Sequence, residues 1–265
     1  MGNTFFFKNK FDLIVSLGED CACTSYLRRF NLQDYTFPFD WLTRASFTTR
    51  IDLICNNFEN FLRKENIYKL GFPYNTRINC EHADYEDKKL EFNFYHDFNK
   101  YLEFSDAFND VKSKYNRRIA RFYNLAENSN KILFVWWDRS NKIEFDTIIE
   151  SYKKLSNKFP KKDVYLLLIF YSEIENHTSL ENEHIYIAKY NNLFNIKDHS
   201  NNDTLGNTLN NYKLFKKIRK QRSPYYIFKY FLFYLFKVLV VLIPFRETRS
   251  KLRHKIRYIF FKAKL

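Results

Sequence analysis

The sequence predicts an α/β domain in which a mostly parallel sheet is flanked by helices, in a doubly wound arrangement of the Rossmann or hydrolase type. Apolar runs of strand length, FDLIVSL (11–17), KILFVWW (131–137) and DVYLLLIFY (163–171), alternate with segments of helical periodicity. Uninterrupted apolar runs are typical of strands buried on both faces, as in parallel sheets. The 30 Phe and 20 Tyr, against only 4 Gly and 5 Pro, exclude a disordered or collagen-like chain.

The first half of the domain begins with a strand and a helix. The predicted strand 11–17 ends at Gly18, and residues 21–30 have the composition of a helix. Pro38 interrupts the helical pattern, and a second helix is expected over 46–62, with Cys55 on its apolar face. The aromatic segments within 64–106 do not reveal the order of their elements.

The second half alternates more regularly. A long amphipathic helix is expected over 107–125, where large apolar residues recur at helical spacing. The elements expected after it are a strand at 131–137, a helix at 145–159, strands at 163–171 and 184–189, and a closing helix at 206–222.

The positive charge is concentrated near the C-terminus. The formal net charge is +14, but residues 213–265 carry 16 Lys or Arg and one acid, Glu247, so the rest of the chain is nearly neutral. Basicity confined to one segment indicates an appended surface-binding tail. We therefore expect an α/β domain over 1–222 and a membrane-binding tail over 223–265.

The cysteines argue against a metal site. Cys21, Cys23, Cys55 and Cys80 lack the paired spacing of zinc ligands, so neither a metal nor another cofactor is expected. Residues 1–10 lack the apolar core and cleavage site of a secretory signal. We expect a cytoplasmic protein with reduced thiols.

The turn SLGEDC (16–21) is the first candidate site, because open α/β sheets place ligands at the carboxyl ends of their strands. Cys21 would begin a helix, whose dipole favours a thiolate, although the carboxylates of Glu19 and Asp20 oppose it. The alternative is a small buried cysteine without reactivity.

Five motifs carry a resemblance to known proteins. They are S-L-G-x-x-C followed by L-R, FPFDW (37–41), the segment around His96 and Asp97, YNRR (115–118) with Arg121, and ILFVWW (132–137). Together they resemble a bacterial family of uncharacterised proteins described as papain-like cysteine peptidases. The resemblance covers residues 11–170 and implies Cys21 as nucleophile, His96 as general base and an acid such as Asp97 to orient the imidazole.

The orienting acid is left open, because Asp97 adjoins His96 and neighbours on a strand point to opposite faces. The alternatives are Asp40, Asp138 and Asp198, and His199 is a reserve base. The strand-turn-helix setting of Cys21 is closer to the nucleophile of serine hydrolases on doubly wound sheets than to papain. We therefore expect hydrolysis or acyl transfer, on a peptide bond or a non-peptide ester.

A basic helix face supports a second interpretation. The guanidinium groups of Arg117, Arg118 and Arg121, with Lys114 beside them, could hold a phosphate by bidentate hydrogen bonds. The chain would then be a glycan or phospho-glycan transferase in which Cys21 is structural. The plainer alternative is a solvated helix face.

The tail combines an apolar block with basic residues. Residues 225–245 are apolar apart from a few positions that include Lys229 and Lys237, and 246–265 form a basic amphipathic pattern with Arg249, Arg253 and Arg257. Each basic residue near an anionic surface contributes about 1 kcal/mol. We expect peripheral attachment to the inner membrane, and the apolar block argues against a nucleic-acid partner.

Two short elements of the tail, LIPFR (242–246) and R-x-K-L-R (249–253), resemble the C-terminal segments of bacterial lipopolysaccharide glycosyltransferases. The resemblance implies a lipid-linked glycan or its precursor as substrate, and a role in surface polysaccharide biosynthesis. A non-catalytic scaffold that recruits enzymes to the membrane is the remaining alternative.

Overall fold

The chain divides into two units, Met1–Lys220 and Gln221–Leu265. This computed structural model describes residues 5–70, 81–138, 143–172, 176–190, 214–222, 224–241 and 252. Asp198, His199, Arg249, Arg253 and Arg257 lie outside the described residues, as do residues 206–213 of the expected helix 206–222. In the described remainder, 214–217 are helical, but Arg219–Lys220 form a short strand, so the expected helix is wrong at its end.

A five-stranded sheet forms the centre of the first unit, in the order β2-β7-β8-β10-β9. Four strands run parallel, and β9 is an antiparallel strand at one edge. The strands are β2 (Leu13–Ser16), β7 (Lys131–Asp138), β8 (Asp163–Tyr171), β9 (Asn176–Leu180) and β10 (Ile185–Tyr190). The mostly parallel α/β sheet predicted from the sequence is thus confirmed.

The doubly wound, Rossmann-like order is not confirmed. The four parallel strands lie side by side in the order in which they occur in the chain. Among these four described parallel strands there is therefore no reversal of order, which is the feature that creates the ligand crevice of a doubly wound sheet. Ligands of open α/β sheets bind at the carboxyl ends of the strands, so this edge is still the expected position of a ligand site.

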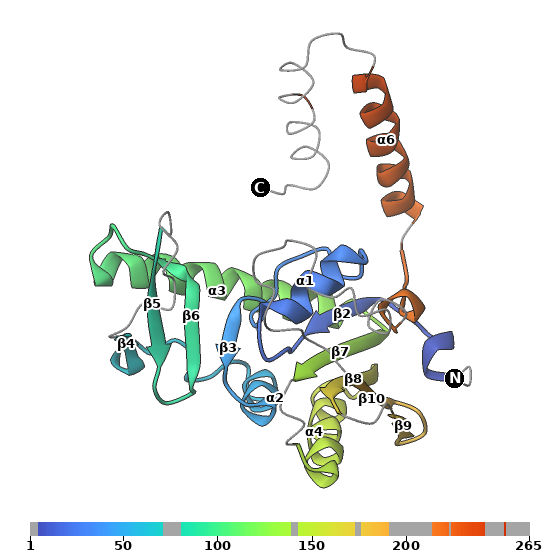
Figure 1. The fold of residues 1–265 in the computed structure, drawn as a ribbon, viewed down its shortest axis with the longest axis horizontal. Coiled ribbons are helices and arrows are strands. Elements are labelled where there is room, and N and C mark those ends of the chain that lie inside the picture. The colour runs from blue at the N-terminus through green and yellow to red at the C-terminus, as the bar shows by residue number, and fades with distance from the viewer. Residues whose placement is uncertain are drawn as a thin grey trace. The chain divides into compact units, whose positions relative to one another are not determined.

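Both faces of the sheet are buried, as the continuous apolar runs predict. Along β7, Phe134 and Trp136 face a core that includes α2 (Phe47–Cys55) and α4 (Phe145–Lys158). Val135 and Trp137 face the opposite core, which includes α1 (Cys21–Arg29). Helices on opposite sides of the sheet are visible in Figure 1.

The predicted strand 11–17 is divided at Asp12. The Asp12 carboxylate accepts hydrogen bonds from the backbone N–H groups of Asn130 and Lys131, at 2.8 and 2.9 Å. This bend leaves β1 (Lys10–Phe11) to pair with β11 (Arg219–Lys220), while β2 pairs with β7. A short 3-10 helix, η1 (Phe5–Lys8), precedes β1.

A large insertion separates β2 from β7 and contains a second, antiparallel sheet of order β3-β6-β5-β4. Three of these strands, β4, β5 and β6, lie in the region 64–106 whose order the sequence did not reveal, and β3 lies between α1 and α2. Besides α1 and α2, the elements of the insertion are β3 (Leu42–Arg44), η2 (Lys64–Asn66), β4 (Ile67–Lys69), β5 (His82–Asp87), β6 (Phe92–Asn99) and α3 (Phe104–Glu127).

The helix expected over 46–62 is wrong beyond Cys55, where α2 ends. Asn57, Phe58, Asn60 and Leu62 have φ angles of 54°, 58°, 66° and 53°. These left-handed conformations cannot continue a right-handed helix. Phe58, Phe61 and Leu62 still pack in the core. The apolar pattern therefore predicted their burial correctly but predicted the wrong secondary structure.

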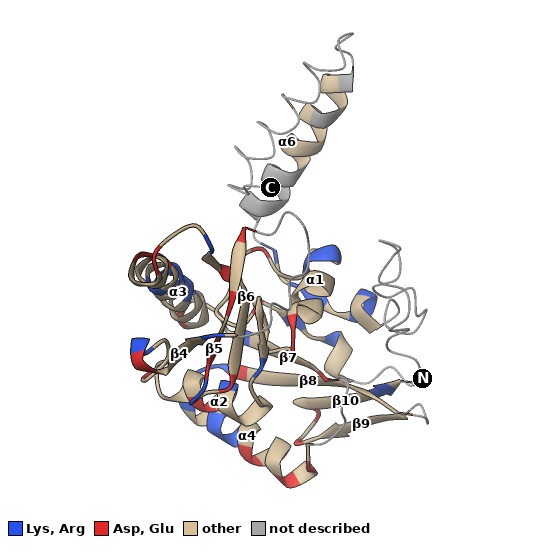
Figure 2. Cartoon of the chain, turned by 60° about the vertical axis from the view of Figure 1, so that its left-hand side comes forward, with Lys and Arg blue, Asp and Glu red and all other residues tan. Residues whose placement is uncertain are grey.

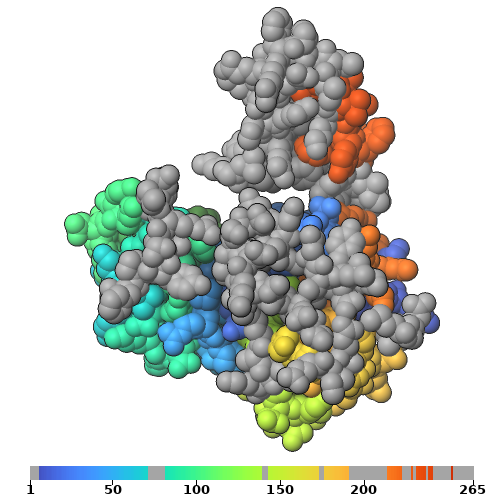
Figure 3. All heavy atoms as spheres, in the orientation of Figure 1, coloured from blue at the N-terminus to red at the C-terminus, as the bar shows by residue number. Residues whose placement is uncertain are grey.

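In the second unit, α6 (Pro224–Val241) presents large apolar side chains to solvent. Phe231 is 62% exposed and Val238 is 64% exposed. The described part of α6 shows neither blue nor red charged residues in Figure 2, and its side chains form part of the outer surface in Figure 3. Within the described residues, no helix has the length and apolarity needed to span a bilayer.

Candidate functional site

Cys21 is the first residue of α1, directly after the turn that leaves β2. The chain continues beside β7 through hydrogen bonds from the N–H of Leu17 to the Val135 carbonyl, 2.7 Å, and from the N–H of Glu19 to the Trp137 carbonyl, 3.2 Å. Asp20 caps the helix by accepting from the N–H of Ala22 at 2.8 Å. The strand, turn and helix predicted around Cys21 are thus present, and Cys21 is partly exposed at the carboxyl edge of the sheet.

Gly18 allows this turn to pack against α1. A Cβ atom at Gly18 would lie 2.3 Å from Cβ of Cys23 and 3.2 Å from its sulfur. The turn and the first turn of α1 therefore approach each other more closely than any side chain at position 18 permits.

The other described cysteines have structural surroundings. Cys23 is fully buried, its thiol lies 3.6 Å from the Val135 carbonyl, and burial raises its pKa to about 12. Cys55 ends α2, packs against the core as its spacing predicts, and has a pKa raised by burial. Cys21, Cys23 and Cys55 are thiols rather than disulfides.

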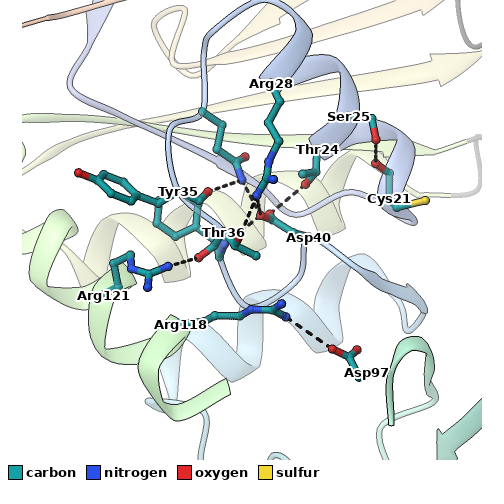
Figure 4. A network of polar contacts seen from close by, with 12 residues as sticks. Cys21, Thr24, Ser25, Arg28, Tyr35, Thr36, Asp40, Asp97, Arg118 and Arg121 are labelled. Atoms are coloured by element: carbon teal, nitrogen blue, oxygen red, sulfur yellow. Dashed lines mark hydrogen bonds and ion pairs between the residues drawn. The ribbon is translucent and has the colours of Figure 1, made fainter. Parts of the chain in front are cut away.

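Asp40, in the FPFDW segment, holds α1 in place through contacts with Thr24 and Arg28. Its buried carboxylate accepts hydrogen bonds from the Thr24 hydroxyl at 2.9 Å, the Gln33 amide at 2.6 Å and the Phe37 N–H at 2.9 Å. Arg28 of α1 forms an ion pair with the same carboxylate at 3.3 Å. Burial raises the pKa of Asp40, although these four donors act in the opposite direction. Figure 4 shows this network beside Cys21 and Ser25.

His96 lies on β6 with an exposed side chain. Its ring meets the Trp41 indole edge-on, with centroids 5.9 Å apart, and the Arg28 guanidinium lies 5.5 Å from the same indole. Arg28 is seven residues after Cys21, so the two residues occupy one face of α1, two turns apart. Trp41 and Arg28 thus connect His96 to the helix of Cys21, while the catalytic pairing of Cys21 with His96 stays a prediction.

Asp97 follows His96 in an irregular part of β6, where the register with β5 shifts. Its buried carboxylate accepts from the Tyr115 hydroxyl at 2.8 Å and pairs with Lys114 at 2.6 Å and Arg118 at 3.8 Å. All three partners belong to α3. These contacts give Asp97 a role in holding α3 and do not favour it as the acid that orients His96.

Of the other two described candidates for that acid, Asp138 is placed best. Asp40 is occupied by its four donors, whereas Asp138 ends β7 at the edge where the Cys21 turn lies. Asp138 is buried and accepts from the Trp136 indole N–H at 3.3 Å.

The arginines predicted as a phosphate clamp already have contacts within the protein. Arg118 pairs with Asp97, Arg121 donates to the Thr36 carbonyl at 3.0 Å, and Arg117 donates to the Ser113 hydroxyl at 2.9 Å. Figure 4 shows Arg118 and Arg121 directed to these separate partners. Across the described ranges, no three His, Cys, Asp or Glu side chains gather as a metal ion would require.

Arg50 is the residue that sequence reasoning missed. It lies on α2, is fully buried, and donates to the carbonyl oxygen of Glu19 at 3.0 Å, two residues before Cys21. One sequence signal could have revealed it. Phe47, Ile51 and Ile54 recur at helical spacing and form an apolar helix face, and Arg50 lies on that same face.

The family comparison decides what this arrangement is related to. Residues 12–174, more than half of the chain, match the model of a domain-of-unknown-function family described as "putative papain-like cysteine peptidase". The chain belongs to this family. The family match includes Cys21, His96 and the α3 arginines, and it ends before α6, so the likeness of the tail to glycosyltransferases stays a prediction.

A second comparison gives a viral relative. An uncharacterized protein of Acanthamoeba polyphaga mimivirus is 27% identical over 150 residues, which cover 52% of this chain and 67% of that protein. No solved structure gives a significant match. The bacterial origin that the sequence resemblance implies stays a prediction.

Proposed function

We propose that this member of the papain-like cysteine peptidase family is a cysteine-dependent hydrolase or acyltransferase with Cys21 as its nucleophile. The observation that carries the proposal is the position of Cys21, partly exposed as the first residue of α1 at the carboxyl edge of the sheet. A helix N-terminus favours a thiolate over a thiol. Cys23, two residues away, is buried with a pKa raised to about 12 and serves as an internal contrast.

The proposed reaction needs a nucleophile and a base. His96 accepts the thiol proton, directly or through water, and the Cys21 thiolate attacks an acyl carbon to form a thioester. The imidazolium returns the proton to the departing amine or alcohol. Water, in a hydrolase, or an acceptor hydroxyl, in an acyltransferase, then attacks the thioester and regenerates the thiol. Asp138 is our preferred orienting acid, because it lies at the same edge as the Cys21 turn.

The proposed location is the cytoplasmic face of a membrane, with a lipid-linked glycan or its precursor as substrate. The support comes from the tail, whose residues 213–265 carry 16 Lys or Arg and one acid, and from the exposed apolar surface of α6. A helix with an unpartnered apolar surface next to many basic residues suits an anionic lipid surface.

The transferase alternative has weaker support. A phosphate clamp needs several guanidinium groups directed at one point. The contacts of Arg117, Arg118 and Arg121 lead instead to three different partners in the protein. A membrane scaffold without catalysis would leave Cys21 replaceable by Ser or Ala.

The test is the pH dependence of iodoacetamide alkylation at Cys21 in the full chain, followed by mass spectrometry of the Cys21 peptide, with a His96→Ala variant beside it. A midpoint below about 8.5, the value of an ordinary thiol, which rises in His96→Ala, supports the nucleophile and its base. A Cys21 thiol that is alkylated slowly, or with the midpoint of an ordinary thiol, contradicts the proposal. Cys23 in the same digest reports whether the protein has stayed folded.

A further inference from the structure

Arg50 is a buried cation whose hydrogen-bond acceptors are all neutral. Its guanidinium donates to the carbonyl oxygens of Ala45 at 3.1 Å, Leu42 at 3.4 Å and Glu19 at 3.0 Å. Among the described residues, no ion pair joins Arg50 to a carboxylate, and its Nη1 atom is buried without a hydrogen-bond partner. Burial lowers the pKa of Arg50 to about 9, so it remains charged at neutral pH.

Aromatic rings surround this charge. The guanidinium carbon lies 5.5 Å from the Phe39 ring, 5.1 Å from Phe92 and 5.5 Å from Trp136. Cation–π contacts offset part of the desolvation of a guanidinium. The negative charge that a buried cation normally requires comes from Glu19 and Asp20, which act on Arg50 without an ion pair among the described residues.

The bond to Glu19 reaches the turn that precedes Cys21. It joins residues 31 apart in sequence and brings α2 against the segment between β2 and α1. The charged or titratable groups that face Arg50 are Glu19 and Asp20 of the turn, Cys23 of α1 and Tyr115 of α3. Asp138, at the end of β7, is a further acid at the same edge of the sheet.

We propose that Arg50 is a positioning residue for Cys21, which fixes the preceding turn through the Glu19 carbonyl and supplies a buried positive charge that stabilises negative charge formed at Cys21. This deepens the proposed function and rests on it. The Glu19 and Asp20 carboxylates already favour the charged form of Arg50. A thiolate formed at Cys21, the residue after Asp20, adds a further anion at the same turn, and the Arg50 charge would stabilise it as well.

The experiment compares Arg50→Met and Arg50→Lys in the full chain, with Arg63→Met as the matched control on an exposed arginine. Alkylation of Cys21 by iodoacetamide is measured across pH, and urea unfolding of each variant is measured in parallel. We expect Arg50→Met to shift the alkylation midpoint upward and to slow the reaction at pH 7 about tenfold, the factor that corresponds to one pH unit. Arg63→Met should match the wild type.

Arg50→Lys keeps the charge but cannot span three carbonyls, so it separates the two effects. We expect its midpoint to stay near that of the wild type while its limiting rate falls. A purely structural role would lower stability in both variants and leave the midpoint of the folded protein unchanged, which overturns the proposal. If Arg50→Met does not fold, a Lys variant with the midpoint of an ordinary thiol overturns it equally.

The two proposals fail in different ways. An ordinary thiol at Cys21 in the wild type sinks the nucleophile. A reactive wild-type Cys21 whose midpoint is the same in folded Arg50→Met sinks only the role of Arg50.

Discussion

The hydroxyl oxygen of Tyr115 lies 2.8 Å from a carboxylate oxygen of Asp97 and joins the long helix α3 to strand β6. Asp97 also pairs with Lys114 of the same helix, at 2.6 Å. His96, the preceding residue on β6, is exposed. The strand that carries the proposed base is therefore held in place by the buried contacts of its neighbour in sequence.

We predict that Asp97→Ala lowers the free energy of unfolding by about 2–4 kcal/mol, because it leaves the Tyr115 hydroxyl and two cations near the interior without their acceptor. Urea unfolding measures the change, and Asp110→Asn on the exposed face of α3 should stay within about 0.5 kcal/mol of the wild type. If Asp97→Ala were fully stable yet abolished the reactivity of Cys21, Asp97 would be acting on His96 after all.

The position of Cys21 followed from the apolar run that ends at Gly18, since such a run marks a strand and the turn after it. The antiparallel sheet did not, because HADYED (82–87) has no two-residue apolar alternation and buries only Asp84 and Asp87. Apolar runs also do not show in which spatial order the strands lie within the sheet. For this reason the sequence could not distinguish the doubly wound order from the observed one.

Arg50 shows a different limit. An arginine on a helix is normally assigned to the surface, since charged side chains are seldom fully buried. Its partners include the backbone carbonyl of Glu19 in the turn after β2 and the aromatic faces of Phe92 on β6 and Trp136 on β7, which no local pattern brings together. Only the tertiary structure could reveal that this residue lies against the Cys21 turn.

Gly18→Ala tests the close approach of that turn to α1. The added methyl would stand 2.3 Å from Cβ of Cys23, which has no freedom to move within the helix. We expect a loss of about 1–3 kcal/mol in the free energy of unfolding and a changed alkylation rate at Cys21. Arg29→Ala, at an exposed position in the last turn of α1, is the control. A Gly18→Ala protein with unchanged stability and unchanged reactivity of Cys21 would show that the turn can accept a side chain at position 18, which contradicts the close approach.

Cys23 makes stability depend on pH in an identifiable way. Its pKa is raised by burial from 9.0 to about 12, so the native state keeps a proton that the unfolded state loses above about pH 9. The stabilisation is complete below pH 8 and declines as pH rises toward 12. We expect the stability difference between wild type and Cys23→Ala to shrink by about 1.4 kcal/mol from pH 8 to pH 10. Denaturant unfolding at each pH gives the difference, and parallel curves for the two proteins would refute the assignment.

The exposed side of α6 gives the last prediction, which concerns the membrane. Phe231 and Phe236 are 62% and 44% exposed, and burying such side chains in a lipid headgroup layer removes apolar surface from water. We expect the wild type to sediment with vesicles of phosphatidylcholine and phosphatidylglycerol more strongly than with phosphatidylcholine alone, because the basic tail is attracted to anionic lipid. Phe231→Ser with Phe236→Ser should weaken binding to both kinds of vesicle.

The control for that experiment is Phe145→Ser, which changes a phenylalanine of similar exposure, 48%, in the first unit. Binding that depends on α6 must be insensitive to Phe145, and binding that depends on the basic residues must fall as salt is added. A chain that lacks residues 223–265 should remain in the supernatant under all conditions. If that truncated chain still sedimented with anionic vesicles, the lipid contact would belong to the α/β unit, and the proposed location of the Cys21 chemistry would need a different anchor.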